Sequence, residues 1–153
     1  MANPLREAIK RYFYPYAESQ GFKRAKSSHP QFTSFRRFQG ERIHVFDVQW
    51  DKYGRPRFIV NFGEANVNNV GVPKMEVETQ HCNHMYRLQR KKGGSYSCWF
   101  QLRKPWLEAL SSRRLKYQPE EVVDQLIAYF LEMEAWWSDK LEGPHVQRLR
   151  RVG

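Results

Sequence analysis

Apolar side chains recur at helical spacing near the start of the chain and predict an amphipathic helix there. The stripe consists of Leu5, Ile9, Tyr12, Phe13 and Tyr16. Asn3 is a favourable N-cap residue, Pro4 suits the first helical position, and Gly21 is a natural stop. Pro15 removes one backbone donor, so we expect it to kink or shorten this helix.

The pattern then changes to alternation typical of β-strands. Residues 31–38 are rich in strand-forming side chains, residues 42–50 alternate cleanly, and residues 57–63 form the return strand after a turn at 51–56. On the clean strand, one face carries Arg42, His44, Phe46, Val48 and Trp50, and the other carries Ile43, Val45, Asp47, Gln49 and Asp51. The short connections predict an antiparallel meander.

The following part of the chain is less regular. Residues 63–79 are expected to form a long loop that ends in an edge strand. Residues 85–88 and 95–102 then predict a last hairpin around Gly93 and Gly94.

Two helices are predicted after this hairpin, a short one opening at Pro105 and a longer one that begins at Pro119 and stops at Gly143. The apolar side of the longer helix consists of Val122, Val123, Leu126, Ile127, Phe130, Met133 and Trp137. The sequence therefore predicts an α+β fold, an antiparallel sheet of four to five strands with an N-terminal helix and two C-terminal helices packed on it. Residues 1–153 are expected to form a single domain, with residues 143–153 as a basic tail that either stays flexible or folds back on the domain.

Composition supports a packed core in spite of a mean hydropathy of −0.80, because 23 residues are Phe, Trp or Tyr. The first residues contain no apolar run typical of a signal peptide, and no stretch approaches the roughly 20 apolar residues of a membrane helix. We therefore expect a cytoplasmic location and no membrane partner, with Cys82 and Cys98 as reduced thiols.

The formal charge of +10 is unevenly distributed. Residues 81–117 contain nine Lys or Arg against one acidic residue, whereas residues 118–142 contain one against seven. One interpretation is that the two segments neutralise each other across a helix–sheet contact; the alternative is that the basic segment meets an anionic partner.

Several segments together resemble a known family. They are the leading helix that closes on Gly21-Phe22-Lys23, the strand pair that ends in Asn61-Phe62-Gly63, and Cys82 and Arg87-Leu88 ahead of Trp99-Phe100. In these features, over residues 5 to 102, the chain resembles the family named domain of unknown function 4304. The resemblance implies a small bacterial intracellular domain, and it supplies no activity or catalytic residue.

His81, Cys82 and His84 are the strongest candidates for a metal site. With Cys98 added they offer at most three ligands in one geometry, where structural zinc takes four. Phosphate-loop, dinucleotide-binding and serine-nucleophile motifs are absent from the sequence. We therefore predict no metal, no cofactor and no catalytic residue.

A carboxylate cluster offers an alternative chemistry. Asp47, Gln49 and Asp51 share a strand face, and with Glu76 and Glu78 they could hold Mg²⁺ for phosphodiester cleavage.

The basic segment supplies the preferred candidate site. Its predicted anion-binding residues are Arg87, Arg90, Lys91, Lys92, Arg103, Lys104, Arg113, Arg114 and Lys116. Such side chains bind phosphates without reading sequence, and Tyr86, Tyr96 and Trp99 nearby are candidates for stacking on exposed bases. The sequence thus predicts a non-enzymatic binding module for an anionic partner, which is either a nucleic acid or another polyanion or an acidic protein. One alternative is a regulatory or immunity-type protein-binding domain, which would need an acidic partner or would use the acidic helix. The other alternative is the metal-dependent phosphodiesterase.

Overall fold

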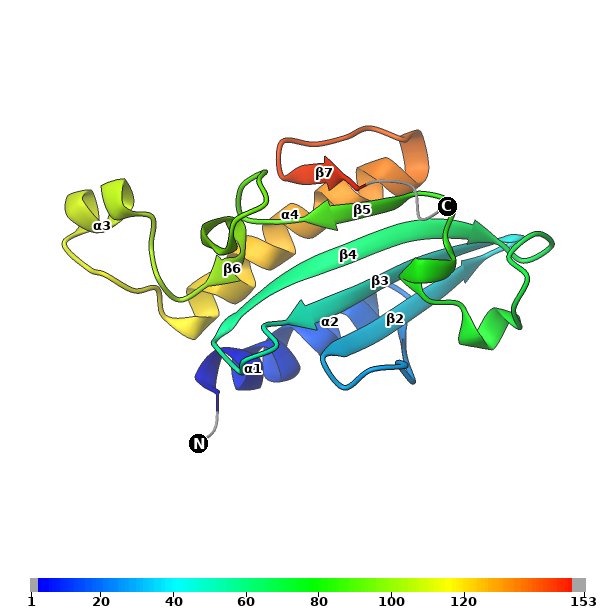
Figure 1. Ribbon diagram of the computed structural model, residues 1–153, viewed down its shortest axis with the longest axis horizontal. Coiled ribbons are helices and arrows are strands. Elements are labelled where there is room, and N and C mark those ends of the chain that lie inside the picture. The colour runs from blue at the N-terminus through cyan, green and yellow to red at the C-terminus, as the bar shows by residue number, and fades with distance from the viewer. Residues whose placement is uncertain (1–2, 150–153) are drawn as a thin grey trace.

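The computed structural model describes residues 3–149 and contains one antiparallel sheet with helices on one face (Figure 1). The helical segments are α1 (Pro4–Ala8), the π-helical turn η1 (Ile9–Phe13), α2 (Tyr14–Ser19), α3 (Trp106–Ser112), α4 (Pro119–Asp139) and the 3-10 turns η2 (Lys74–Glu76), η3 (Thr79–His81) and η4 (Tyr96–Cys98). The strands are β1 (Lys23–Ala25), β2 (Phe32–Gln39), β3 (Arg42–Trp50), β4 (Arg57–Asn66), β5 (Met85–Leu88), β6 (Phe100–Gln101) and β7 (Val146–Arg148). The α+β class is confirmed, but the predicted four to five strands were too few, because seven strands lie within the described residues.

The N-terminal helix begins and continues as its sequence dictates. The Asn3 side chain caps it by accepting from the backbone N–H groups of Leu5 and Arg6, at 3.1 and 3.2 Å. Pro15 does not end the helix, which runs through it to Ser19. A π-helical turn precedes the proline, and the Tyr14 N–H donates to Ile9 five residues back. This wider turn accommodates a residue that has no N–H of its own.

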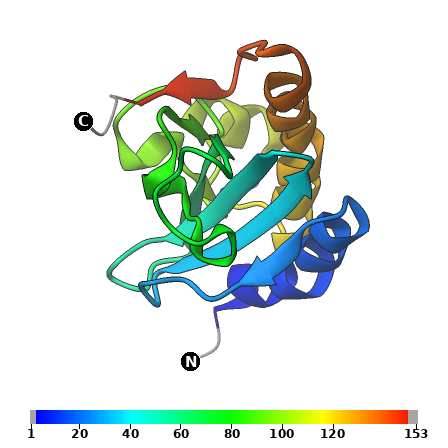
Figure 2. The same cartoon turned by 90° about the vertical axis from the view of Figure 1, so that its right-hand side faces the viewer.

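The predicted meander is confirmed by the register of β2, β3 and β4. Phe46 on β3 lies opposite Phe35 on β2 and Phe62 on β4, and these rings face the helices. The Trp137 indole of α4 reaches the sheet and donates to the Gly63 carbonyl at 2.9 Å. Figure 2 shows α4 and the N-terminal helix side by side on this face. Aromatic contacts between the two layers therefore build the main core.

The strands after β4 differ from the predicted hairpin. β5 and β6 do not pair with each other; both pair with β4, with Leu88 opposite Val60 and Phe100 opposite Phe58. The connection between them, residues 89–99, is a loop that contains η4. The hairpin prediction was wrong because β6 is only two residues long and gains its place from a partner far away in sequence.

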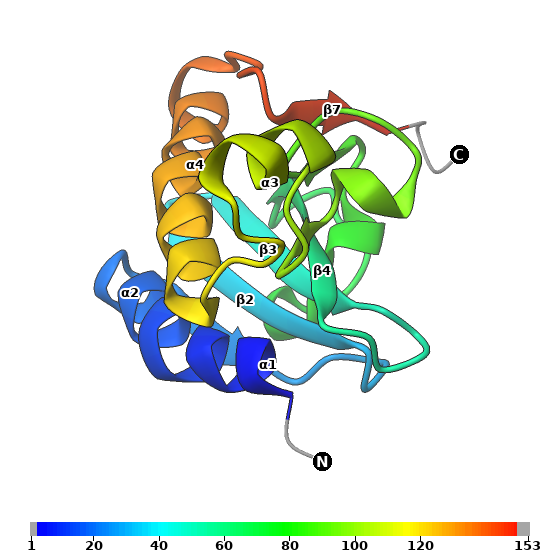
Figure 3. The ribbon, with the colours of Figure 1, turned by 90° about the vertical axis from the view of Figure 1, so that its left-hand side faces the viewer.

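The second C-terminal helix also differs from the prediction. α4 packs on the sheet, but α3 buries none of its residues and projects from the end of the molecule (Figures 1 and 3). The prediction that two C-terminal helices cover the sheet was therefore wrong for the shorter one.

The opposite face of the sheet is partly covered by residues 67–84. This segment contains two 3-10 turns and no strand, so the predicted edge strand is not formed. Ile43 and Val45 pack there with Val77 and Cys82 in a small second core.

The end of the described chain is part of the sheet. β7 pairs with β5, and Val146 is buried, so residues 146–148 fold back on the domain and are not a flexible tail. The rest of the predicted tail, residues 150–153, lies outside the described residues. Among the described residues, no helix is both long and apolar enough to cross a membrane.

Candidate anion-binding groove

An arm formed by residues 102–117 carries α3 and forms one wall of a groove. Its stem is a short ladder in which Lys104 N–H donates to Leu115 O at 3.0 Å and Tyr117 N–H donates to Leu102 O at 2.7 Å. We call this segment the α3 arm. These hydrogen bonds join the two ends of the arm, and α3 itself is exposed.

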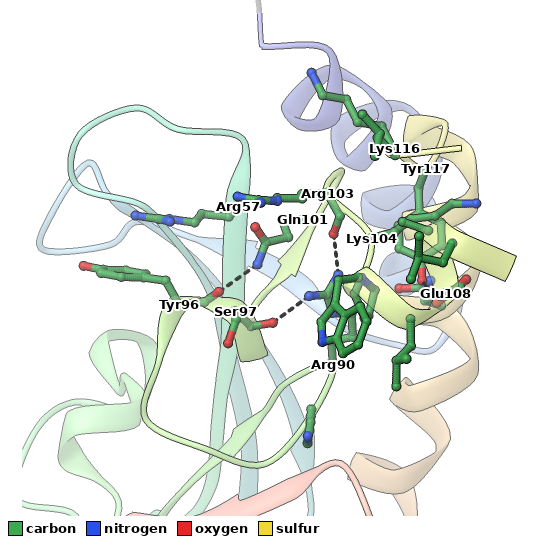
Figure 4. Close-up of a pocket in the computed structure, with 18 of the residues that line it drawn as sticks. Arg57, Arg90, Tyr96, Ser97, Gln101, Arg103, Lys104, Glu108, Lys116 and Tyr117 are labelled. Atoms are coloured by element: carbon green, nitrogen blue, oxygen red, sulfur yellow. Dashed lines mark hydrogen bonds between the residues drawn. The ribbon is translucent and has the colours of Figure 1, made fainter. Parts of the chain in front are cut away.

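The other wall is the loop that precedes β6. The Arg90 guanidinium joins loop and arm, since it donates to the carbonyl oxygens of Ser97 and Arg103 at 2.6 and 2.7 Å (Figure 4). Gln101 holds the loop by donating to Tyr96 O at 2.7 Å. The Arg57 guanidinium lies over the Tyr96 ring, 3.8 Å from its centroid.

Between these walls lies an open groove of about 1310 Å³, which we call the basic groove. The cationic residues that line it are Arg57, Arg90, Lys91, Arg103, Lys104 and Lys116. Glu108 is the one acidic residue among its lining residues, and its carboxylate accepts from the Tyr117 hydroxyl. Burial, followed by the hydrogen bond to Glu108, raises the pKa of Tyr117 to about 12, so the tyrosine remains a donor at neutral pH.

The positive charge in the groove is compensated in part, because Arg57 pairs with Asp51 at 2.9 Å. Arg103 and Lys116 are paired across the stem, so two basic residues occupy facing backbone positions there. Within residues 3–149, neither side chain lies within 4.0 Å of a carboxylate, and the same holds for Lys91. Lys104 is only 6% exposed, and its ammonium donates to the Ser112 hydroxyl at 2.9 Å. Burial lowers the pKa of Arg90, the effect expected where charge is held away from water.

The predicted anion-binding residues do not all lie in this groove. Five of the nine line it, whereas Arg87, Lys92, Arg113 and Arg114 do not. Arg87 points to the opposite face of the sheet and donates to the Asn61 side chain at 3.2 Å. Arg114 forms an ion pair with Glu121 at 3.3 Å. A run of basic residues in sequence was therefore divided between different surfaces by the fold.

The groove also contains a cation that the sequence did not suggest. Arg57 begins β4 and reaches the groove because it pairs with Gln101 of β6. Of the three rings expected to stack on bases, Tyr86 and Trp99 are buried, and Tyr96 remains 41% exposed.

Neutralisation of the basic segment by the acidic helix is limited. Arg114–Glu121 is the one ion pair between residues 81–117 and 118–142 in the described part of the chain. Glu134 instead pairs with Arg37 at 2.6 Å, and Glu132 pairs with His145 at 2.6 Å. Two carboxylates of the acidic helix are thus paired outside the basic segment, and the helix neutralises little of that segment.

Two of the carboxylates suggested for Mg²⁺, Asp47 and Asp51, are engaged by other side chains. Asp47 is buried and accepts from Asn61 Nδ2 at 2.8 Å and from Thr79 Oγ1 at 2.6 Å. Asp51 caps its turn and forms an ion pair with Arg57 at 2.9 Å. Across residues 3–149, no group of three or more His, Cys, Asp or Glu residues is arranged to hold a metal ion. His81, Cys82 and His84 therefore do not form such a group in the structure.

Comparison with known protein families, curated proteins and solved structures found no match to this chain. The resemblance to the family named domain of unknown function 4304 stays a prediction from the sequence.

Proposed function

We propose that this protein is a binding module for an anionic partner, which it holds in the basic groove. The observation that carries the proposal is the set of six cationic side chains around one open groove that contains a single carboxylate. The stem keeps two of these cations, Arg103 and Lys116, directly opposite each other. An anion bound at the stem would be attracted by both of these positive charges.

The proposal is tested with fluorescein-labelled polyanions, namely single- and double-stranded RNA and DNA of mixed sequence and poly-glutamate. Anisotropy is measured from about 50 to 300 mM salt, where a single strand that contacts the three exposed cations Lys91, Arg103 and Lys116 gives a log–log slope of about −2. The test variant is Arg103→Glu/Lys116→Glu, which reverses the charge of the stem. The control variant is Lys23→Glu/Lys26→Glu, which changes the net charge equally at β1, the far edge of the sheet.

We expect binding of at least one polyanion at low salt, at least about tenfold weaker in the stem variant and within about twofold of wild type in the control. If none of the polyanions binds at the lowest salt, or if both variants weaken binding equally, the groove is not an anion site.

A further inference from the structure

The α3 arm exposes large apolar side chains that the rest of the molecule does not use. Trp106, Leu107, Leu110 and Leu115 are 71%, 65%, 68% and 77% exposed, and all four line the basic groove. Together they present apolar surface on the order of 500 Å², as large as the largest patch of a typical monomer. α3 has seven residues, too few for a stable isolated helix in water, and it buries none of them.

These side chains suit a protein segment better than a nucleic acid. Bases are bound by stacking on flat aromatic faces, and three of the four exposed residues are leucines, which offer none. The Tyr96 ring already has the Arg57 guanidinium over it, which leaves Trp106 as the exposed aromatic ring of the arm. Leucine and tryptophan on an exposed helix are instead typical of surfaces that receive the apolar side of an amphipathic helix.

The positive charge of the groove indicates that the other side of such a helix carries acidic residues. Arg90 and Lys91 lie on the loop wall, Arg57 lies at the start of β4, and Arg103 and Lys116 lie at the stem. The leucines lie on the arm. A helix that fills the groove meets leucines along one side and cations along the other. A second copy of this chain is a poor occupant, because its formal charge of +10 opposes self-association.

We infer that the basic groove binds an acidic amphipathic helical segment of a partner protein, with its apolar side on the α3 arm and its carboxylates on the loop and stem. This inference rests on the proposed function and narrows its partner to a protein.

The test begins with peptides selected on the wild-type protein from a phage-displayed random library of about 16 residues, long enough for four helical turns. We expect enrichment of Glu and Asp together with apolar residues spaced i, i+3 or i+4, and i+7. The best synthetic peptide is then labelled and titrated by anisotropy against two variants. Leu107→Ser/Leu110→Ser alters the arm, and Leu131→Ser/Leu141→Ser alters leucines of similar exposure outside the groove. All four positions are exposed, and circular dichroism confirms that each variant folds.

We expect the arm variant to weaken peptide binding at least about tenfold, the control variant to leave it within about twofold, and the arm variant to bind single-stranded RNA as the wild type does. Equal peptide affinity for the arm variant and the wild type overturns the inference, as does a selection that enriches no acidic amphipathic sequence. RNA affinity that falls with the leucine changes would assign the arm to a nucleic acid. A wild-type dimer in sedimentation that the arm variant abolishes would assign it to a second copy. The proposed function fails separately, because it depends on the Arg103→Glu/Lys116→Glu variant and not on the leucines.

Discussion

Replacing Asp47 by asparagine should change how the stability of this protein depends on pH. The Asp47 carboxyl is buried under residues 67–84, where Asn61 and Thr79 donate to it. Burial is the largest effect on its pKa and raises it from 3.8 to about 6, with Glu78 nearby adding to the rise. The two hydrogen bonds and the Arg87 guanidinium act in the opposite direction and are too weak to cancel the burial.

The sign of the effect follows from which form the fold disfavours. Because the pKa is higher in the folded protein, the protonated acid is the better-tolerated form, and stability falls as the pH rises from 3.8 to about 6. The difference between these two values, at about 1.4 kcal/mol per pKa unit, amounts to about 3 kcal/mol. Asparagine has the shape of the protonated acid and never ionises, so the Asp47→Asn variant avoids this loss.

The assay is urea denaturation of both proteins at intervals from pH 4 to pH 8, with the free energy of unfolding taken at each pH. We expect the variant to gain about 2.5 kcal/mol relative to the wild type between pH 4 and pH 7.5, because about 0.5 kcal/mol of the full effect is already present at pH 4. His44, whose pKa burial lowers to about 4, contributes stability that is lost as pH falls through the same range. This contribution is present in both proteins and cancels in the difference. A difference that stays constant across the range would show that Asp47 does not titrate as its buried position requires.

Three further outcomes test the core and the arm. Replacing residues 103–116 by Asn-Gly joins Leu102 to Tyr117, which are already hydrogen-bonded to each other. We expect the free energy of unfolding to stay within about 1 kcal/mol of wild type, and peptide and polyanion binding to be lost. Unfolding of this variant would show that residues 103–116 are part of the core. Burial raises the pKa of Cys82 to about 12. Iodoacetamide at pH 8 should therefore modify Cys82 at least about a hundredfold more slowly in the native protein than in the protein unfolded in urea, as measured by mass spectrometry. Rapid labelling of the native protein would contradict this. Trp137→Phe leaves the buried Gly63 carbonyl of β4 without its donor. The free energy of unfolding in urea should fall by about 2 kcal/mol. A loss below about 0.5 kcal/mol would mean that another group replaces the hydrogen bond.

The elements that could be predicted from the sequence are those whose signals are local. Asn3, Pro4 and the apolar stripe define the first helix, and the alternation in residues 42–50 defines β3. β5, β6 and β7 are two to four residues long, and pairing with distant partners, not composition, determines their positions. No periodicity is measurable over so few residues.

The site was predicted in part for a similar reason. The basic character of residues 90–116 is visible in the sequence, but neighbouring side chains diverge, so Lys91 lines the groove and Lys92 does not. Arg57 is more than forty residues from Arg103 in sequence, and only the pairing of β4 with β6 brings it into the groove. The short helix was expected to pack on the sheet, because burial is the usual fate of residues such as Trp106, Leu107 and Leu110. Their exposure becomes visible only once the aromatic residues of α4 and the sheet are seen to fill the core.

The main core and the α3 arm have different roles, since the core stabilises the fold and the arm is proposed to bind a partner. Most of the main core is built without the α3 arm, since its buried rings come mainly from the N-terminal helix, the sheet and α4, and the arm adds the Tyr117 ring at the base of its stem. The arm contributes little to that core, and it exposes large leucine side chains to water. The arm lowers the solubility of the free protein, yet its stem forms a ladder of backbone hydrogen bonds. Contacts made in a complex best explain such a segment. Changes in the core should therefore alter stability without altering specificity, whereas changes in the arm should do the reverse.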